Sequence, residues 1–469
     1  MGALDQYDII VIGSGPAGQK AAIQGSKANR KVVVIEQELA PGGACVHQGT
    51  IPSKTLRETA VAFSGFRRRT GGTFPLPQRE DLQMHSLMSR LKQVVSAHEQ
   101  YMTEHLQRNN IEVIHGRAHF EAPNVIEVES TGGGKRTLGA VLVVIASGSR
   151  PRNPTDVAID HEHILDSDSI LSISYLPRSL VVMGAGVIAS EYASIFGTLG
   201  TRVTMVDSSE RPLSFLDPEL SDRFLRVFTE HDGRFVAKQR AKKIEWDGLS
   251  EVVTTLESGE TLRSEKVLYA LGRVANVEGM NIQAAGLETT SRGYLAVDEN
   301  CRTKVPHIYA VGDVIGPPSL ASAAMEQGRR AVCHALGLPL SHGSELIPIG
   351  VYTVPEISSV GITEAQAIER HGSAVVGRAP FHELARGQIS ANQDGLLKLV
   401  ADPSGQRLLG VQVIGEGAAE LVHVGQMALI ANQPIDVFVE QIFNFPTLAE
   451  AYRVAAFDIA KQRARRTKS

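Results

Sequence analysis

The feature that most constrains the fold of this 469-residue chain is a glycine-rich turn between two short apolar runs. The run Ile9–Ile12 leads into the sequence GSGPAG at residues 13–18 and an Ala-rich stretch. A second apolar run, Val32–Ile35, then ends at Glu36. Short continuous apolar runs bounded by turn signals are typical of buried parallel strands. The pattern therefore predicts a strand, a glycine turn, a helix and a second strand, which together form one βαβ unit.

The same arrangement returns further along the chain. The run Leu180–Met183 leads into GAGVIA at residues 184–189, and the run Val203–Val206 ends at Asp207. The first glycine of the turn precedes the terminal acid by 23 residues in both copies. We therefore predict an α/β fold with two Rossmann-like dinucleotide-binding domains.

Each glycine of such a turn has its own role in holding a dinucleotide. The first makes the tight turn, the second lets the backbone approach the pyrophosphate, and the third allows the helix to pack closely on the strand. The N-terminus of the helix then offers free N–H groups to the anion. These positions are Gly13, Gly15 and Gly18 in the first copy, and Gly184, Gly186 and Ala189 in the second. The complete fingerprint favours dinucleotide binding over two turns that serve only the fold.

The acid at the end of each second strand indicates how the nucleotide is recognised. Glu36 is expected to accept hydrogen bonds from the ribose hydroxyls of a bound adenosine. Asp207 would accept a 2′-hydroxyl but repel a 2′-phosphate, which makes NAD(H) the easier ligand of the second unit. Arg202 and Arg211 lie close in sequence, and a partial offset of this repulsion by either one is the alternative, which would admit NADP(H).

Composition excludes several classes of protein. Lys and Arg total 47 against 51 Asp and Glu, which gives a net charge of −4 and disfavours a nucleic-acid binder. No apolar run approaches the roughly 18 residues that a membrane span needs. Residues 1–8 lack the features of a secretory signal, and three cysteines are too few for a disulfide framework. We expect a cytoplasmic enzyme with no nucleic-acid or membrane partner.

Two further segments carry a resemblance to a known family. The segment Gly42–Lys54, GGACVHQGTIPSK, and the segment Tyr309–Asp313, YAVGD, resemble the flavoprotein disulfide reductases, such as lipoamide dehydrogenase and glutathione reductase. The match extends from Tyr7 to about Ala460. The resemblance implies FAD in the first unit, a nicotinamide nucleotide in the second, and a C-terminal α+β domain that makes a homodimer or a higher homo-oligomer.

The chain departs from this family at the residues that reduce disulfides. Family members use two cysteines separated by four residues, whereas here Cys45 is followed at that spacing by Thr50. A threonine hydroxyl cannot form the disulfide. The family also carries a His before Pro-Thr and a Glu five residues after that His; here these residues are Phe445 and Glu450. Because Phe cannot move a proton, we expect no disulfide reduction.

One branch of the family shares both departures: the soluble pyridine nucleotide transhydrogenases. Residues 166–171, 351–361 and 449–456 also resemble that branch. The resemblance implies an FAD-dependent NAD(P) oxidoreductase of the Si-specific transhydrogenase type, which passes a hydride between NAD(H) and NADP(H) through the flavin. Two alternatives remain open: an NADH-dependent diaphorase or quinone reductase, and a flavin-binding redox sensor with vestigial catalysis.

The resemblance also assigns roles to individual residues. Lys54 lies beside the flavin and pairs with Glu191, and Asp313 contacts the ribityl chain. Cys45 is either a thiolate next to the flavin or an inert packed thiol. Further cofactor-binding positions in the matched motifs are Gly43, Ser147, Gly148, Gly272 and Gly312; among them, Ser147, Gly148 and Gly272 fit a structural turn equally well.

We predict three domains and no metal site. The FAD-binding domain comprises residues 1–152 and 280–345, the NAD(P)-binding domain 153–279, and the dimerisation domain 346–469. Cys301 and Cys333 lack a CxxC partner, which disfavours zinc. The pair His161 and His163 is expected to face solvent rather than a metal.

Overall fold

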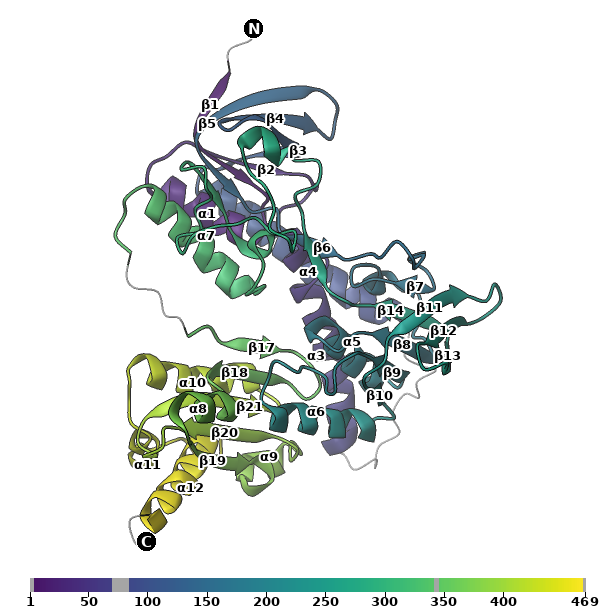
Figure 1. Ribbon diagram of the computed structural model, residues 1–469, viewed down its shortest axis with the longest axis vertical. Coiled ribbons are helices and arrows are strands. Elements are labelled where there is room, and N and C mark those ends of the chain that lie inside the picture. Colours follow the sequence, from purple (N-terminus) through teal and green to yellow (C-terminus); the bar gives the residue numbers. More distant parts are fainter. Residues whose placement is uncertain (1–3, 70–83, 341–345, 467–469) are drawn as a thin grey trace. The chain divides into compact units, whose positions relative to one another are not determined.

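The computed structural model describes residues 4–69, 84–340 and 346–466, and the chain divides into two compact units (Figure 1). The first unit is assembled from Met1–Thr55, Met88–Arg152 and Gly272–Gly343, and the second from Leu56–Leu87, Asn153–Leu271 and Ser344–Ser469. Among the described residues, no helix combines the length and the apolar character that crossing a bilayer requires. The boundaries of the three predicted domains stay a prediction.

A mixed sheet forms the centre of the first unit. Its parallel strands run in the order β3-β2-β1-β5-β16, and β4 joins β3 and β5 by antiparallel pairing. The strands are β1 (Asp5–Ile12), β2 (Val32–Glu36), β3 (Glu112–Ala122), β4 (Val125–Ser130), β5 (Lys135–Ile145) and β16 (Ile308–Ala310). The apolar runs at residues 9–12 and 32–35 are buried throughout, because both faces of these parallel strands are covered.

Helices cover one face of this sheet. Side chains of β1 alternate: Ile9 and Val11 pack with α1, α4 and α7, whereas Ile10 and Ile12 pack against the β3–β5 meander. These helices are α1 (Pro16–Lys27), α4 (Met84–Arg108) and α7 (Ala321–Ala335). The shorter elements are α2 (Gly43–His47), η3 (Ile282–Ala285), η4 (Gly312–Ile315) and the strand pair β6 (Ser149–Pro151) and β15 (Arg273–Ala275). The helix α3 (Thr50–Arg69) begins in the first unit, and its residues from Leu56 onward belong to the second.

The second unit begins with another parallel sheet, in the order β10-β9-β8-β14-β7. Its elements are β7 (Ile164–Leu165), β8 (Ser179–Met183), α5 (Val187–Thr198), β9 (Arg202–Val206), α6 (Pro218–Glu230), β10 (Arg234–Val236) and β14 (Lys266–Tyr269), with η2 (Ser169–Ser172) between β7 and β8. An antiparallel sheet follows β10 and consists of β11 (Ala241–Trp246), β12 (Val252–Leu256) and β13 (Thr261–Ser264). The second glycine turn therefore lies in a Rossmann-like sheet of its own.

The C-terminal part of the second unit is an antiparallel sheet with helices, in the strand order β17-β18-β21-β20-β19. Its strands are β17 (Ile349–Val351), β18 (Ile357–Gly361), β19 (Val375–Pro380), β20 (Leu396–Ala401) and β21 (Leu408–Ile414). Its helices are α8 (Glu364–His371), α9 (Ala385–Ile389), α10 (Ala418–Ile430), α11 (Asp436–Glu440) and α12 (Glu450–Arg466), with η5 (Phe381–Glu383) after β19. Two Rossmann-like sheets and a C-terminal α+β domain confirm the predicted fold class.

A buried ion cluster ties this C-terminal sheet to α6 within the second unit. The ammonium group of Lys398, on β20, is only 2% exposed and lies 2.9 Å from Asp217 Oδ2 and 2.8 Å from Glu364 Oε2. Asp217 also accepts the Glu219 N–H and so caps the first turn of α6. Because an unpaired buried charge is costly, this cluster fixes the position of α6 on the sheet.

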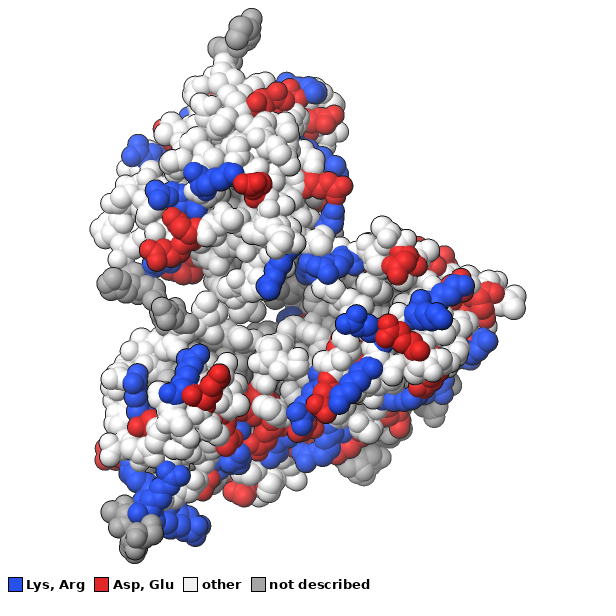
Figure 2. All heavy atoms as spheres, viewed as in Figure 1, with Lys and Arg blue, Asp and Glu red and all other residues white. Residues whose placement is uncertain are grey.

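Figure 2 shows positive and negative side chains interspersed over the visible face, as the net charge of −4 leads one to expect. The end of α12 is locally basic, with Arg463, Arg465 and Arg466 in its last turn.

Candidate functional site

The first glycine turn can be made only by glycine at two of its positions. Gly13 has φ +101°, and a Cβ there would lie 2.4 Å from the Ala146 carbonyl oxygen. A Cβ at Gly18 would lie 1.9 Å from the Gly13 carbonyl oxygen. At Gly15 the nearest atom is the Gly43 Cα at 4.0 Å, so this position contacts the next loop without a clash. The turn thus brings bare backbone to the N-terminus of α1, where N–H groups are free to bind a pyrophosphate.

Glu36, at the end of β2, is held rigidly beside this turn. The side chain is only 5% exposed. Its Oε2 accepts the Ser14 backbone N–H at 2.8 Å and the Ser14 hydroxyl at 2.5 Å, and its Oε1 accepts the Glu38 N–H at 3.0 Å. A carboxylate oxygen has two lone pairs, so Oε1 keeps one for a ribose hydroxyl. The predicted ribose contact therefore fits the geometry of this site.

The segment that follows packs directly on the glycine turn. Gly43 has φ +59°, and a Cβ there would lie 2.9 Å from the Gly15 Cα, so the two backbones touch. Cys45 lies in α2, and Thr50 begins the next helix, α3, five residues later. Burial raises the pKa of the Cys45 thiol, against the smaller lowering effects of Thr50 and of the nearby Lys54 ammonium. The raised pKa favours a neutral thiol over a thiolate at Cys45.

Asp313 is positioned by residues that the sequence did not identify. It follows β16 in the short helix η4, where Gly312 has φ +77° and donates its N–H to the Gln327 side chain at 2.9 Å. Asp313 Oδ2 accepts the Ser149 hydroxyl at 2.7 Å, and Arg273 Nε donates to the same hydroxyl oxygen at 2.9 Å. These hydrogen bonds fix the orientation of the Asp313 carboxylate. A carboxylate with a fixed orientation is what binding a polyhydroxyl chain would require.

The turn residues predicted near this position, Ser147, Gly148 and Gly272, each have a role in the backbone; their contact with a cofactor stays a prediction. The Ser147 hydroxyl donates to the Asn276 carbonyl oxygen at 2.6 Å, and the Asn276 side chain donates back to the Ser147 carbonyl oxygen at 3.0 Å. Ser147 therefore joins two backbone segments of the first unit. Gly148 and Gly272 have φ +70° and +106°, and a Cβ at either position would meet no described atom within 4 Å, so both satisfy a backbone requirement.

The second glycine turn repeats the first but is more open. Gly184 has φ +115°, and a Cβ there would lie 2.7 Å from the Ala270 carbonyl oxygen. A Cβ at Gly186 would meet no described atom within 4 Å, and Ala189 is fully buried at the third position. Asp207 Oδ1 accepts the Ser209 backbone N–H at 2.7 Å and the Ser209 hydroxyl at 2.5 Å. Its other oxygen, Oδ2, has no hydrogen-bond donor among the described residues.

Only one of the two arginines predicted to offset Asp207 is near it. Arg202 is the first residue of β9, whereas Asp207 follows the last, so a strand of about 16 Å separates them. Arg211 lies beyond the carboxyl end of β9, as Asp207 does, and its guanidinium pairs with the Asp222 carboxylate at 2.8 Å. The sequence missed Lys238, whose backbone N–H donates to the Ser209 carbonyl oxygen and whose ammonium group lies 3.1 Å from Glu210. Lys238 follows the neighbouring strand β10, a proximity that only the sheet order reveals.

Glu191, on α5, is nearly buried and helps to hold a loop of the second unit. Its Oε1 accepts the Tyr352 backbone N–H at 2.8 Å. Ser194, one turn along α5, accepts the Val354 N–H at 3.0 Å, and Arg57 Nε on α3 donates to the Thr353 carbonyl oxygen at 2.9 Å. Residues 352–354 are therefore fixed to α5 and α3. The predicted ion pair of Glu191 with Lys54 stays a prediction.

The expectation that His161 and His163 face solvent is right for His161 and wrong for His163. His163 Nδ1 lies 3.2 Å from Asp160 and its ring stacks on Trp246 at 3.6 Å, while the His161 side chain is 57% exposed. Within the described ranges, the side chains that could hold a metal are His119, Glu121 and Glu127, which strand pairing of β3 and β4 brings together. Lys135 already bonds Glu127 at 2.6 Å.

The C-terminal part exposes a set of large apolar side chains. Phe445, at the position of the family's histidine, is 74% exposed and Ile442 is 93% exposed. Further exposed apolar residues on α10 are Val424, Met427 and Ile430. Glu450 accepts the Thr447 backbone N–H at 3.4 Å rather than facing a histidine. An exposed apolar surface of this kind marks a protein–protein interface.

Comparison with protein families agrees with this architecture. Residues 7–328 match the model of the pyridine nucleotide-disulphide oxidoreductases, and residues 347–456 match the dimerisation domain of the same enzymes. The chain belongs to the pyridine nucleotide-disulphide oxidoreductase family. This assignment confirms the family to which the sequence motifs pointed, and it makes the chain an oxidoreductase that binds FAD and a pyridine nucleotide.

Similar curated members of the family are soluble pyridine nucleotide transhydrogenases. The protein of that name from Mycobacterium tuberculosis is 41% identical over 97% of this chain and 97% of its own length. Those from Hahella chejuensis and Vibrio cholerae are 42% and 41% identical over 97% and 98% of this chain, and 98% and 99% of their own lengths.

Two solved structures of the family share the fold. The HOCl-induced flavoprotein disulfide reductase RclA from Escherichia coli, solved as a Cu(II) complex, superposes with a TM-score of 0.88 at 25% identity, covering 97% of this chain and 99% of its own. LpdA from Mycobacterium tuberculosis also has a TM-score of 0.88, at 27% identity and with the same coverage.

Proposed function

We propose that this protein is an FAD-dependent pyridine nucleotide transhydrogenase that passes a hydride between NAD(H) and NADP(H). The observation that carries the proposal is Thr50, the first residue of α3, which stands five residues after Cys45 where disulfide reductases of the family have their second cysteine. The chain therefore keeps the first cysteine of the family's dithiol, but it cannot form the disulfide because the second cysteine is replaced. Relatives at about 41% identity carry the name of this activity, and no observation favours the diaphorase or the redox sensor.

The residues of the first unit fit FAD. Gly15 lets the backbone approach a pyrophosphate at the N-terminus of α1, while Gly13 and Gly18 allow the tight turn and the close packing of the helix. Glu36 keeps a lone pair for the ribose. Asp313, held by Ser149, would bind the ribityl hydroxyls. Bound flavin supplies a two-electron centre that accepts a hydride from one nicotinamide and returns it to another.

The protein's own groups would orient the reactants and stabilise charge. Lys54, in the second turn of α3, has its ammonium group near Cys45, where it would stabilise negative charge on a reduced cofactor. Cys45, with its raised pKa, adds no competing negative charge. No acid–base histidine is needed, because a hydride moves without a proton; Phe445 is therefore compatible with the reaction.

The second unit would take NAD(H) and NADP(H) in turn. Gly186 leaves the turn open to a pyrophosphate, and Asp207 offers a free oxygen to the 2′-hydroxyl of NAD(H). Arg211 and Lys238 would offset the repulsion between Asp207 and a 2′-phosphate, since both lie beyond the carboxyl ends of the strands that carry Asp207 and its neighbour.

A homodimer in the cytoplasm completes the proposal. The dimerisation-domain match covers the part of the chain that exposes Ile442, Phe445 and Met427. Sedimentation of the purified protein should give a dimer, and Met427→Asp should shift it toward the monomer. A stable wild-type monomer would contradict this assignment of the surface.

The function is tested with the purified flavoprotein under anaerobic conditions. NADPH with thio-NAD⁺ should give sustained turnover with parallel lines in a double-reciprocal plot, as a ping-pong reaction at one nicotinamide site requires. Lipoamide and oxidised glutathione should give no turnover above an enzyme-free control. Steady reduction of either disulfide, or turnover with a quinone but not with thio-NAD⁺, would overturn the proposal.

A further inference from the structure

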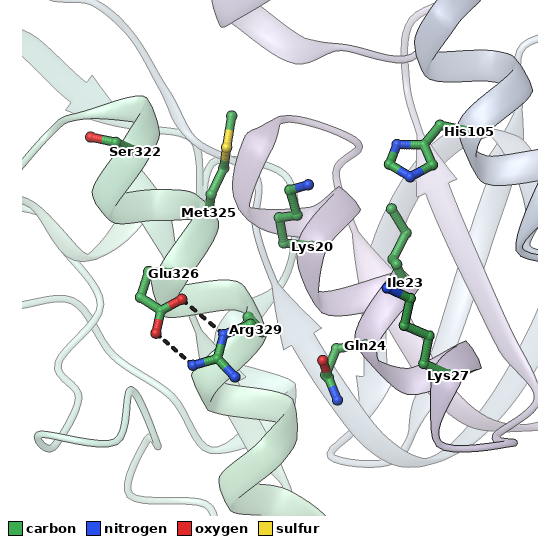
Figure 3. A pocket seen from close by; sticks show the side chains of 9 residues that line it. All are labelled: Lys20, Ile23, Gln24, Lys27, His105, Ser322, Met325, Glu326 and Arg329. Carbon is green, nitrogen blue, oxygen red and sulfur yellow. Dashed lines mark hydrogen bonds and ion pairs between the residues drawn. The ribbon is translucent and has the colours of Figure 1, made fainter. Parts of the chain in front are cut away.

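A groove on the helical face of the first unit has features that dinucleotide binding does not explain. It lies among α1, α4 and α7 and has a volume of about 320 Å³ (Figure 3). This volume is within the range of pockets that hold small ligands. The lining residues are Lys20, Ile23, Gln24, Lys27, His105, Ser322, Met325, Glu326 and Arg329.

The spacing of these residues shows why they converge. Residues 20, 23, 24 and 27 lie at i, i+3, i+4 and i+7 on α1, and residues 322, 325, 326 and 329 repeat that spacing on α7. Each set therefore forms a single helix face. His105, from α4, closes one side (Figure 3). Three segments far apart in the sequence build the groove together.

Small residues hold the two helices close enough to form it. A Cβ at Gly328 on α7 would lie 2.1 Å from the Ala17 carbonyl oxygen on α1, so the helices touch at their backbones. Ala21 on α1 and Ala324 on α7 are buried in the same core. The long side chains at the edge of this contact then stand on either side of a depression, and Ile23 and Met325 give it an apolar floor.

The groove carries uncompensated positive charge. Neither the Lys20 nor the Lys27 ammonium group has a hydrogen bond or an ion pair with any described residue. Arg329 is already neutralised, because its guanidinium makes two hydrogen bonds to the Glu326 carboxylate, of 2.8 and 2.6 Å (Figure 3). The two lysines therefore leave an excess of two positive charges in the depression.

Two further observations agree with a positive field. The pKa of the His105 imidazole is lowered, first by partial burial and then by the nearby cations. Ser322 is the second residue of α7, so the positive end of that helix dipole lies at the groove as well. A field that disfavours protonation of a histidine favours binding of an anion.

We propose that this groove is a binding site for a small organic phosphate. Its phosphate groups meet Lys20 and Lys27, with the N-terminus of α7 nearby, and its apolar part lies on Ile23 and Met325. The depression is too small for a nucleic-acid duplex, and Glu326 at its rim disfavours a continuous polyanion. The site is separate from both glycine turns, since none of its lining residues belongs to either turn.

The test is calorimetric titration of the FAD-loaded protein with pyrophosphate and with ADP, in saturating NAD⁺ so that the second glycine turn is filled. One site per chain is expected, and ADP should bind more tightly than pyrophosphate because it covers the apolar floor. The variant Lys20→Ala/Lys27→Ala should weaken both ligands at least about tenfold, since each charge-assisted bond is worth that much. The control Lys242→Ala/Lys461→Ala removes two exposed lysines elsewhere and should bind as wild type does.

A second variant tests the same site while it keeps both lysine side chains in place. Gln24→Glu is nearly isosteric and places a carboxylate between the two lysines, one turn after Lys20. It should abolish binding while the flavin content and melting temperature stay at or above the wild-type values.

Three outcomes would overturn the proposal. Wild-type protein that binds neither ligand, or variants that bind both as wild type does, would show that the groove is not a phosphate site. ADP no tighter than pyrophosphate would exclude an organic phosphate. Cosedimentation with phosphatidylserine vesicles that Lys20→Ala/Lys27→Ala abolishes would assign the groove to a lipid headgroup instead; we expect no cosedimentation.

Discussion

The two glycine turns share a sequence pattern but differ in how firmly they hold the acid that follows. Glu36 is 5% exposed and accepts three hydrogen bonds on its two oxygens. Asp207 is half-buried and accepts two hydrogen bonds, both from Ser209 on one oxygen. The second glycine differs likewise: Gly15 contacts Gly43, whereas Gly186 has open space around it.

This difference matches two kinds of ligand. A buried, fully oriented site suits a cofactor that stays bound through every turnover, because few groups must be ordered when it binds. An open site with a free carboxylate oxygen suits a nucleotide that must leave after each hydride transfer. If the first site holds a resident ligand and the second an exchanging one, matched substitutions at the two sites should have different effects.

The largest expected difference concerns the third position of each turn. Gly18→Ala would force a Cβ to within 1.9 Å of the Gly13 carbonyl oxygen and should destabilise the protein by about 3 kcal/mol or more, with loss of flavin. The reciprocal change, Ala189→Gly, should cost only about 1 kcal/mol through helix propensity. Flavin absorbance per chain and melting temperature measure both. Equal flavin content in the two variants would remove the distinction between the turns.

The next effect is on the two acids. Glu36→Gln turns an amide N–H₂ toward either the two Ser14 donors or the Glu38 N–H, which should weaken flavin retention and stability by about 1–3 kcal/mol. Asp207→Asn should change flavin retention and stability by less than about 0.5 kcal/mol, because the Asp207 side chain is open to water. Dialysis followed by FAD titration gives the comparison. Flavin lost more readily from the Asp207 variant would reverse our assignment of the two sites.

Of the two acids, Asp207 and not Glu36 should set the preference between NADH and NADPH. NADH should reduce the flavin more efficiently than NADPH by about 1–2 kcal/mol, or 5- to 30-fold, because the carboxylate repels a 2′-phosphate and solvent screens that repulsion. Asp207→Asn should narrow the gap by improving NADPH, with little gain for NADH. Stopped-flow bleaching of the flavin by each nucleotide measures the ratio. A wild-type protein without preference would show that Arg211 and Lys238 fully cancel the carboxylate.

The smallest expected effect is at Lys238. Its ion pair with Glu210 is exposed, so Lys238→Ala should change stability by less than about 1 kcal/mol. The same substitution should nevertheless weaken the binding of NADPH a few-fold and leave the binding of NADH unchanged, since only NADPH carries a 2′-phosphate. Arg202→Ala, at the other end of β9, is the matched control and should affect neither nucleotide. An Arg202 effect as large as that of Lys238 would contradict the strand geometry.

The sequence predicted those parts of the site that depend on local backbone geometry. Gly13 and Gly184 could be found because positive φ and close contact admit only glycine, and such positions recur at fixed spacing from a strand. The fold class followed from the same repeats. The four apolar runs named in the sequence, at residues 9–12, 32–35, 180–183 and 203–206, all lie within strands of the two parallel sheets.

Contacts between distant segments could not be predicted in the same way. Ser149 and Asp313 are 164 residues apart, and no periodic pattern links them. Arg202 was considered beside Asp207 because the two are close in sequence, but an extended strand separates them. Lys238 was missed because only the pairing of β10 with β9 brings it near Ser209. The groove between α1 and α7 likewise depends on helix packing through Gly328.

The central claim, that hydride passes between the two nucleotides through a flavin without a dithiol, can be tested most directly in two half-reactions. Under anaerobic conditions, NADPH is first mixed with the oxidised flavoprotein, and NAD⁺ is added once the flavin absorbance has bleached. We expect NADPH to bleach the flavin at a rate that supports turnover, and NAD⁺ to restore the full oxidised spectrum. Oxidised glutathione in place of NAD⁺ should leave the flavin reduced. A flavin that NADPH cannot bleach, or that returns to the oxidised state only with a disulfide or a quinone, would contradict the central claim.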